Sequence, residues 1–190
     1  MKYCVAAGLL GAMTNFVSGT VIGGPFVNPS NGHSYYLLAP TTWASAQSEA
    51  VSLGGNLATI NDAAEDTWVV TELGDDALDA YPSSVFLLIG LNDQAAEGSY
   101  VWASGESSSY LNWDSNSYSG LGIGPQPNGT FNTNEDAVGI ATRVFTVGRW
   151  HDLIITDLGG AVPVVEAIPE PSSLLPCIAA IGMLRRRRQR

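Results

Sequence analysis

The chain has 190 residues, with 18 Asp and Glu against eight Lys and Arg and a formal net charge of −10. Five of the basic residues are arginines at the extreme C-terminus, so only Arg143 and Arg149 lie in the central chain. A surface this acidic repels phosphates, because phosphate binding depends on clustered cations. We therefore expect no nucleic acid partner, and the length predicts one domain with its own core.

The N-terminal segment, residues 1–19, is typical of a secretory signal peptide. One lysine precedes an apolar stretch at residues 3–13, and the small residues Val17 and Gly19 permit cleavage after Gly19. A buried first strand is the alternative for the same segment. With the signal peptide removed, we expect an exported protein whose folded domain spans residues 28–167.

The domain is predicted to begin with a strand, a helix and a second short strand. Turn residues precede the first strand, at residues 34–38. Thr42 is a typical N-cap, and the apolar residues after it recur at helical spacing as far as a Gly-Gly pair, which predicts a helix over residues 42–53. The short strand follows at residues 56–60.

A second helix and most of the strands are predicted in the rest of the domain. Asp62, with Glu65 three residues later, resembles a capping box and predicts a helix that carries apolar residues as far as Leu73. An acidic loop that contains proline is expected at residues 74–83. Beyond it, the patterns predict strands at residues 85–91, 100–102, 137–141 and 162–166.

Three groups of mainly oxygen-bearing side chains gather after a long loop rich in Ser, Gly and Asn. They are Gln126-Pro127-Asn128, Glu135-Asp136 and Trp150-His151-Asp152. Ca²⁺ takes six to eight oxygen ligands in a loose geometry, and carboxylates and amides supply them. A proline between two such residues is typical of a rigid turn, with a cis bond as one form, that aims both side chains at one point.

These groups resemble the Ca²⁺ and sugar site of C-type lectin-like domains, where a Glu-Pro-Asn or Gln-Pro-Asp triplet, a Glu-Asp and a Trp-Asn-Asp form one site. The resemblance spans roughly residues 30–166 and implies the family's α+β fold, with two helices, short antiparallel strands and a long loop region. Its other blocks, in the family's order, are Thr-Trp-Ala-Ser-Ala at 42–46, Leu-Gly-Gly-Asn-Leu-Ala-Thr-Ile at 53–60, Leu-Ile-Gly-Leu-Asn-Asp at 88–93, Glu-Gly-Ser-Tyr-Val-Trp at 97–102 and Tyr-Leu-Asn-Trp at 110–113.

The resemblance also implies a set of site residues. The expected metal ligands are Gln126, Asn128, Glu135 and Asp152, and the same four residues with His151 are the expected carbohydrate-binding set. His151 stands where the family has Asn, and an imidazole nitrogen is a poor partner for Ca²⁺. Because only two ligands are charged and the triplet mixes galactose-type Gln with mannose-type Asn, we expect weak Ca²⁺ binding and permissive recognition of neutral sugars or exopolysaccharide.

Other readings of these residues stay open. A calcium-independent protein-interaction module on the same fold would use the triplet as a surface turn and leave Glu135 as a solvated charge. Asp136 could serve a neighbouring cation position or cap a strand. An enzyme is not expected, since His33 and His151 are the only histidines and no nucleophile-elbow or metalloprotease motif is present. Nothing in the sequence raises the pKa of a carboxylate as a glycosidase requires.

The two cysteines, Cys4 and Cys177, both lie in terminal apolar segments. The family resemblance places its usual disulfides at Ala50 with Val165 and at Ala137 with Ile155, where both partners of each pair are apolar here. We therefore expect a core that is packed without disulfides, in which packing or bound metal supplies the typical ~2–4 kcal/mol of each missing bridge.

The C-terminal segment, residues 168–190, resembles the PEP-CTERM sorting signal of Gram-negative bacteria. Pro169-Glu170-Pro171 precedes an apolar run and then an arginine cluster at residues 185–190. The resemblance implies recognition by an exosortase and a place at the cell surface or in the extracellular matrix. The apolar run, residues 172–184, is shorter than the ~20 residues of a spanning helix, so only transient membrane contact is expected. A disordered basic tail is the alternative.

Overall fold

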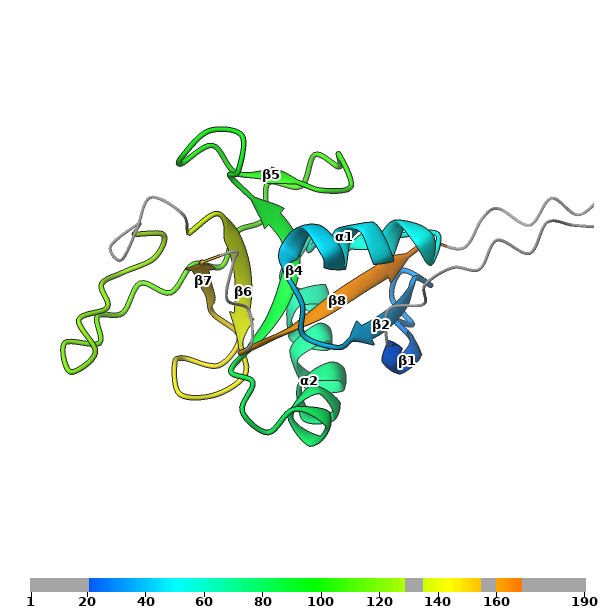
Figure 1. The fold of residues 1–190 in the computed structure, drawn as a ribbon, viewed down its shortest axis with the longest axis horizontal. Helices are drawn as coiled ribbons and strands as arrows, with labels where there is room; N and C mark the ends of the chain where they lie inside the picture. The colour runs from blue at the N-terminus through cyan, green and yellow to red at the C-terminus, as the bar shows by residue number, and fades with distance from the viewer. Residues whose placement is uncertain (1–20, 129–134, 155–159, 169–190) are drawn as a thin grey trace, which may run out of the picture.

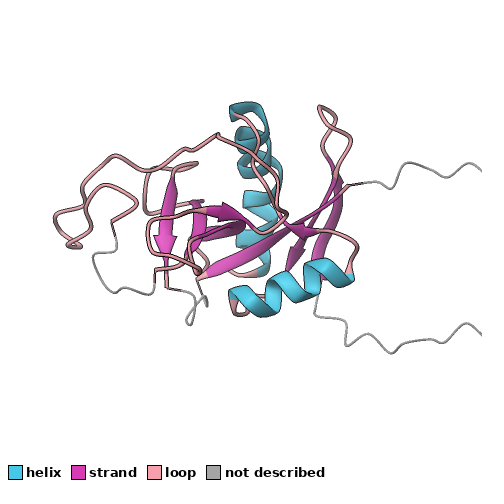
Figure 2. Ribbon diagram, turned by 90° about the horizontal axis from the view of Figure 1, so that it is seen from above, coloured by secondary structure: helices cyan, strands magenta, loops and turns pink. Residues whose placement is uncertain are grey.

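The computed structural model describes residues 21–128, 135–154 and 160–168, so the predicted signal peptide and sorting motif lie outside the described residues. Within the described ranges the chain forms an α+β fold, as predicted, with two helices beside one mixed sheet (Figures 1 and 2). In chain order the elements are β1 (Val21–Val27), β2 (Ser34–Leu38), α1 (Trp43–Ser52), β3 (Asn56–Leu57), α2 (Ala63–Ala80), β4 (Phe86–Asn92), β5 (Val101–Trp102), β6 (Ala137–Ala141), β7 (Trp150–Leu153) and β8 (Ala161–Ala167).

The sheet brings the two ends of the domain together. Its strand order is β1-β2-β8-β4-β6-β7, with β3 paired to β8 and β5 paired to β4. β2 and β8 pair antiparallel from Ser34 with Ala167 to Leu37 with Val164, and they lie side by side in Figure 1. β4 and β8 pair in parallel. The predicted fold requires that an N-terminal strand pair with a C-terminal strand, and β2 with β8 is that pair.

Both predicted helix starts are confirmed. Thr42 Oγ1 accepts a hydrogen bond from Ser45 N at the start of α1. Asp62 Oδ1 accepts hydrogen bonds from Ala64 N and Glu65 N at the start of α2. These side chains satisfy amide groups that have no partner within the helix, which fixes where each helix begins.

The predicted end of the second helix is wrong. We expected a loop at residues 74–83, but α2 continues to Ala80. Leu73 and Ala77 are buried on one face, one turn apart, so the apolar face that packs on the sheet passes Gly74. A glycine inside a helix costs ~1 kcal/mol, and burial of this face outweighs that cost.

Two strands were not predicted. β1 contains two glycines and a proline, and its pairing with β2 is irregular at two points, so its sequence lacks the alternation of a regular strand. β7, which carries His151 and Asp152, was read only as a site motif. It pairs antiparallel with β6, with Val138 opposite Asp152.

Trp150 lies in the larger hydrophobic core. It is fully buried, and the rings of Trp102, Tyr110 and Trp113 meet it edge-on at 5.6–6.0 Å. Its Nε1 donates to Asp66 Oδ1 at 3.1 Å. An indole with a satisfied N–H can be buried completely without the cost of a lost hydrogen bond.

The position of the first missing disulfide is packed as expected. Ala50 of α1 and Val165 of β8 are both fully buried and share a small apolar cluster with Leu38. Ile155, from the second expected pair, lies outside the described residues. Neither helix of the described ranges is long and apolar enough to cross a membrane.

Two buried glutamates join α2, β8 and the turn before β2. The hydroxyl of Tyr35 is hydrogen-bonded to Glu65 Oε1 and lies 3.0 Å from Glu166 Oε1. His33 Nδ1 lies 2.5 Å from the same Glu166 oxygen, and Thr59 N donates to Glu166 Oε2 at 3.0 Å. Burial raises the pKa of Glu166, and the charge of Glu65 raises it further, while the bonds from His33 and Thr59 lower it.

Replacing Gly90 with Ala should destabilise the fold by about 1–3 kcal/mol, the usual cost of overpacking a core. Gly90 lies in β4, and a Cβ atom there would approach the backbone oxygen of Leu57 to 2.5 Å. Chemical denaturation measures the change. Gly120→Ala is the matched control, because a Cβ atom at Gly120 meets nothing within 4 Å. Equal stability of the two variants would contradict this account of the contact between β3 and β4.

Candidate functional site

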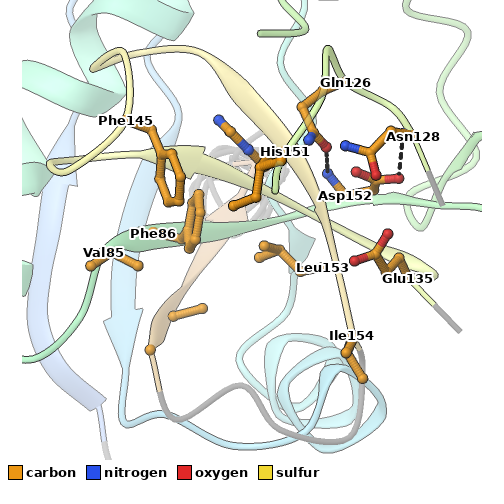
Figure 3. A pocket seen from close by; sticks show the side chains of 13 residues that line it. Val85, Phe86, Gln126, Asn128, Glu135, Phe145, His151, Asp152, Leu153 and Ile154 are labelled. Carbon is orange, nitrogen blue, oxygen red and sulfur yellow. Dashed lines mark hydrogen bonds between the residues drawn. The ribbon is translucent and has the colours of Figure 1, made fainter. Parts of the chain in front are cut away.

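A cavity of about 310 Å³ lies where β4, β7 and the start of β8 meet the long loop (Figure 3). All five residues of the predicted site line it, together with several apolar side chains. The lining consists of Val85, Phe86, Ile123, Gln126, Asn128, Glu135, Phe145, His151, Asp152, Leu153, Ile154, Gly160 and Ala161. Residues that are distant in the sequence therefore converge on one hollow, with a polar end and an apolar end.

The triplet at the polar end is tied to β7. The Gln126–Pro127 bond is cis, one of the forms that the sequence predicted. Asp152 N donates to Gln126 Oε1 at 3.2 Å, and Asn128 N donates to Asp152 Oδ2 at 2.9 Å, as Figure 3 shows. Asp152 thus holds the residues on both sides of Pro127, and both side-chain amide nitrogens donate to Gly124 O, at 3.2 and 3.4 Å.

Two buried carboxylates stand beside these amides. Asp152 lies on β7 and Glu135 precedes β6, and their exposed fractions are 7% and 8%. None of the residues that line the cavity is Lys or Arg. Buried carboxylates are stable only when they are hydrogen-bonded, paired with a positive group or bound to a metal. The negative charge at this end of the cavity therefore favours a cation over an anion.

His151 has a hydrogen-bond partner on the long loop. Its Nε2 lies 3.1 Å from Asp114 Oδ2, and its ring centre lies 4.5 Å from that of Phe145. Burial lowers the pKa of His151, although Asp114 and Asp152 act in the opposite direction. The imidazole forms part of the cavity wall, and its Nε2 contacts Asp114 and not the triplet.

Asp114 is a structural residue of the site that the sequence analysis missed. Its burial acts to raise its pKa, but hydrogen bonds from Tyr118 Oη, Asn116 N and His151 outweigh this and hold the pKa below its usual value. Its backbone oxygen accepts from Gln126 N at 2.7 Å. Asp114 therefore fixes both the loop and the start of the triplet.

A second acidic group lies next to the polar end. Asp93 is buried, and its Oδ1 has no hydrogen-bond partner among the described residues. Burial raises the pKa of Asp136, and the charge of Asp93 raises it further. Burial also raises the pKa of Tyr100, to which the charges of Asp152 and Asp93 contribute. The sequence analysis left Asp136 open as a neighbouring cation position, but it did not include Asp93.

Comparison with known proteins gives one sequence relative of note and many solved structures. No family model matches the chain. Lectin BRA-3 of Megabalanus rosa is 29% identical over 125 residues, which are 64% of each chain, so the match spans less than two thirds of that lectin's length. The C-type lectin CEL-I of Cucumaria echinata is 25% identical, with a TM-score of 0.55 over 73% of this chain and 91% of its own.

A second structure, the carbohydrate-recognition domain of cow CD23, is 19% identical. It has a TM-score of 0.55 over 73% of this chain and 89% of its own. The protein therefore has the C-type lectin-like fold, as the sequence motifs predicted. The likeness to lectins also confirms the prediction that the chain is not an enzyme.

Replacing His151 with Asn should flatten the loss of stability below neutral pH. Burial lowers the pKa of folded His151, so as the pH falls the unfolded chain takes up this proton first, near the usual value of 6.5. Stability is therefore lost as the pH falls through that value, and the His151→Asn variant lacks this loss. The measurement is the melting temperature between about pH 7.5 and about pH 5, with chelator present.

The readout is the slope of melting temperature against pH, which should be steeper in the parent protein. Glu166 contributes in the opposite direction, because its raised pKa makes stability fall as the pH rises. Both proteins contain Glu166, so its contribution cancels in the comparison. Parallel curves for the two proteins would rule out a buried, neutral His151.

Proposed function

We propose that the protein is a carbohydrate-binding module. The observation that carries the proposal is the convergence of Gln126, Asn128, Glu135 and Asp152 at one end of a single cavity, with Asp152 bonded to both amide residues of the triplet. BRA-3 and CEL-I are lectins, and the CD23 structure was determined with a GlcNAc2Man3 oligosaccharide present. The cavity supplies the polar groups and the enclosed volume that a sugar ring requires.

The donor set fits Ca²⁺. Gln126 and Asn128 offer amide oxygens, and Glu135 and Asp152 offer carboxylates, which are the ligand types that Ca²⁺ takes. A bound Ca²⁺ would offset the negative charge and add direct coordination of sugar hydroxyls. His151 adds no oxygen, so the proposed affinity is weak, ~10⁻⁴–10⁻³ M.

The two amides favour permissive recognition of neutral sugars. Each amide can both donate and accept a hydrogen bond, so the residues flanking Pro127 impose no fixed order of donor and acceptor. They also lack the charge that would make these hydrogen bonds about twice as strong. Such a site is most effective when many copies bind one exopolysaccharide together.

In a glycan array, binding to neutral sugars should require Ca²⁺ and should be lost in the Glu135→Gln variant. Removing one of the two charged ligands weakens the binding of Ca²⁺ and hence the binding of the sugar. Ca²⁺ at about 10 mM should also stabilise the parent by about 1–3 kcal/mol, because a ligand that binds only the folded state adds RT ln(1 + [L]/Kd). The shift in melting temperature should be absent in Glu135→Gln.

Glu72→Gln is the matched control, since it removes an exposed carboxylate of α2 that does not line the cavity. It should keep both the array signal and the thermal shift. Equal shifts in the parent and in both variants would indicate diffuse Ca²⁺ binding to the acidic surface, and the proposed ion site would be abandoned.

A calcium-independent protein-interaction module is the second candidate function. Leu121, Val144 and Val147 are 56–67% exposed on the two loops beside the cavity. The loops are joined by Thr146, whose N donates to Tyr118 Oη at 2.8 Å. Exposed apolar side chains grouped on adjoining loops are typical of protein contacts. Binding of a protein partner that chelator leaves unchanged would favour this candidate over the lectin.

We propose further that the protein is exported and sorted to the cell surface or matrix. The support is the sequence of both ends: the apolar N-terminal segment, and the tail with Pro169-Glu170-Pro171, an apolar run and the arginine cluster. An exosortase-type enzyme acting on this tail would leave only transient membrane contact.

If the tail is processed, the mature protein from a bacterial host with such an enzyme should lack residues 185–190. Intact mass of surface-located protein measures this. Replacing Glu170 of the Pro-Glu-Pro motif with Ala should leave the arginine cluster in place, since recognition would be lost. A retained cluster on surface-located parent protein would refute the sorting proposal.

A further inference from the structure

The end of the cavity opposite the triplet is apolar. Val85 and Phe86 line it at the start of β4, Leu153 and Ile154 at the end of β7, and Phe145 from the loop between β6 and β7. Phe86 and Phe145 are stacked, with ring centres 5.4 Å apart (Figure 3). The polar and apolar ends belong to one continuous cavity, so one ligand can reach both.

The backbone groups of Val85, Phe86 and Gly160 at the apolar end are already hydrogen-bonded. Gly160 O accepts from Val85 N at 2.8 Å and from Phe86 N at 3.2 Å. Val85 O accepts from Thr142 N at 2.9 Å. The described side chains of this end are hydrocarbon, so a ligand hydroxyl placed among them would exchange its bonds to water for none. An amide group there would lose two hydrogen bonds to water, one from its N–H and one to its C=O.

We propose that the site selects neutral 6-deoxyhexoses, sugars that carry a methyl group in place of the C6 hydroxymethyl group. This rests on the proposed carbohydrate function and names its ligand class. The ring hydroxyls occupy the polar end at Gln126, Asn128 and Asp152, and the methyl group enters the apolar end. In a hexose, C6 is attached to C5, the ring carbon next to C4, so a hydroxyl on C4 at the polar end places the methyl group two carbons further along the cavity. An acetamido group fits less well, because its N–H and C=O would lack partners.

The test compares pairs of sugars that differ only at C6: D-galactose with 6-deoxy-D-galactose, and D-mannose with 6-deoxy-D-mannose. Each is titrated into the full chain at about 10 mM Ca²⁺, and the dissociation constant is measured from ligand-observed NMR. We expect the better-bound 6-deoxy sugar to bind about tenfold more tightly than its parent sugar, which is the usual discrimination by one small group in an apolar pocket.

Two variants locate the preference. Val85→Thr keeps the shape of the side chain and places a hydroxyl in the apolar end. Ile154→Thr also places a hydroxyl there, in a side chain that is one carbon shorter. At least one of them should reduce the tenfold ratio to about threefold or less, since the new hydroxyl can pair with that of the parent sugar. Val147→Thr, on an exposed part of a loop, is the matched control and should keep the ratio.

The outcomes separate this inference from the function on which it rests. If both members of each pair bind equally, the module binds sugars but the apolar end does not select a methyl group, and the inference is wrong. A preference that survives both threonine variants, or a stronger preference for N-acetylhexosamines, also overturns it. If no sugar binds in these titrations or on the array, the carbohydrate function fails and the inference fails with it.

Discussion

The fold depends on a buried cluster in which the hydroxyl of Tyr35 is hydrogen-bonded to Glu65 and Glu166. These residues come from α2, β8 and β2, so one polar cluster inside the domain links its N-terminal and C-terminal parts. Two carboxylates in one buried place repel each other, and the cluster is stable because donors surround it: Tyr35, His33 and the backbone N–H of Thr59. β8 then pairs with β4, which carries β6 and β7 and so positions the cavity.

The parts of the fold that could be predicted are those with a local physical signal. Thr42 and Asp62 reveal the helix starts, because capping uses residues within three positions. The end of α2 could not be predicted in the same way. Gly74 is a helix terminator by intrinsic preference, and only the sheet that buries Leu73 and Ala77 overrides it. The irregular β1 is likewise defined by its partner β2 and not by a pattern of its own.

In the candidate site, too, the residues with a local sequence signal could be predicted and the others could not. The triplet and Asp152 were found from residue type and order, and the structure brings them together by two hydrogen bonds that span 24 and 26 positions. Asp114 could not be found, since its importance comes from three partners, Tyr118, Asn116 and His151, that meet only in the folded loop. The apolar end of the cavity could not be predicted either, because its side chains come from three separate segments and each alone is ordinary core material.

The two central arginines are both directed at the protein's own oxygen atoms. Arg143 donates to the backbone oxygens of Ser84 and Pro82, and Arg149 donates to the side-chain oxygen of Asn112. Within the described residues no other Lys or Arg is present to offset the acidic groups. The long-range field around the domain is therefore negative, and uronate-rich or sulfated polysaccharides should be repelled at a distance before any contact forms. Because salt screens such a field within about 10 Å at 0.1 M, this exclusion would be strong in fresh water and weak in the sea.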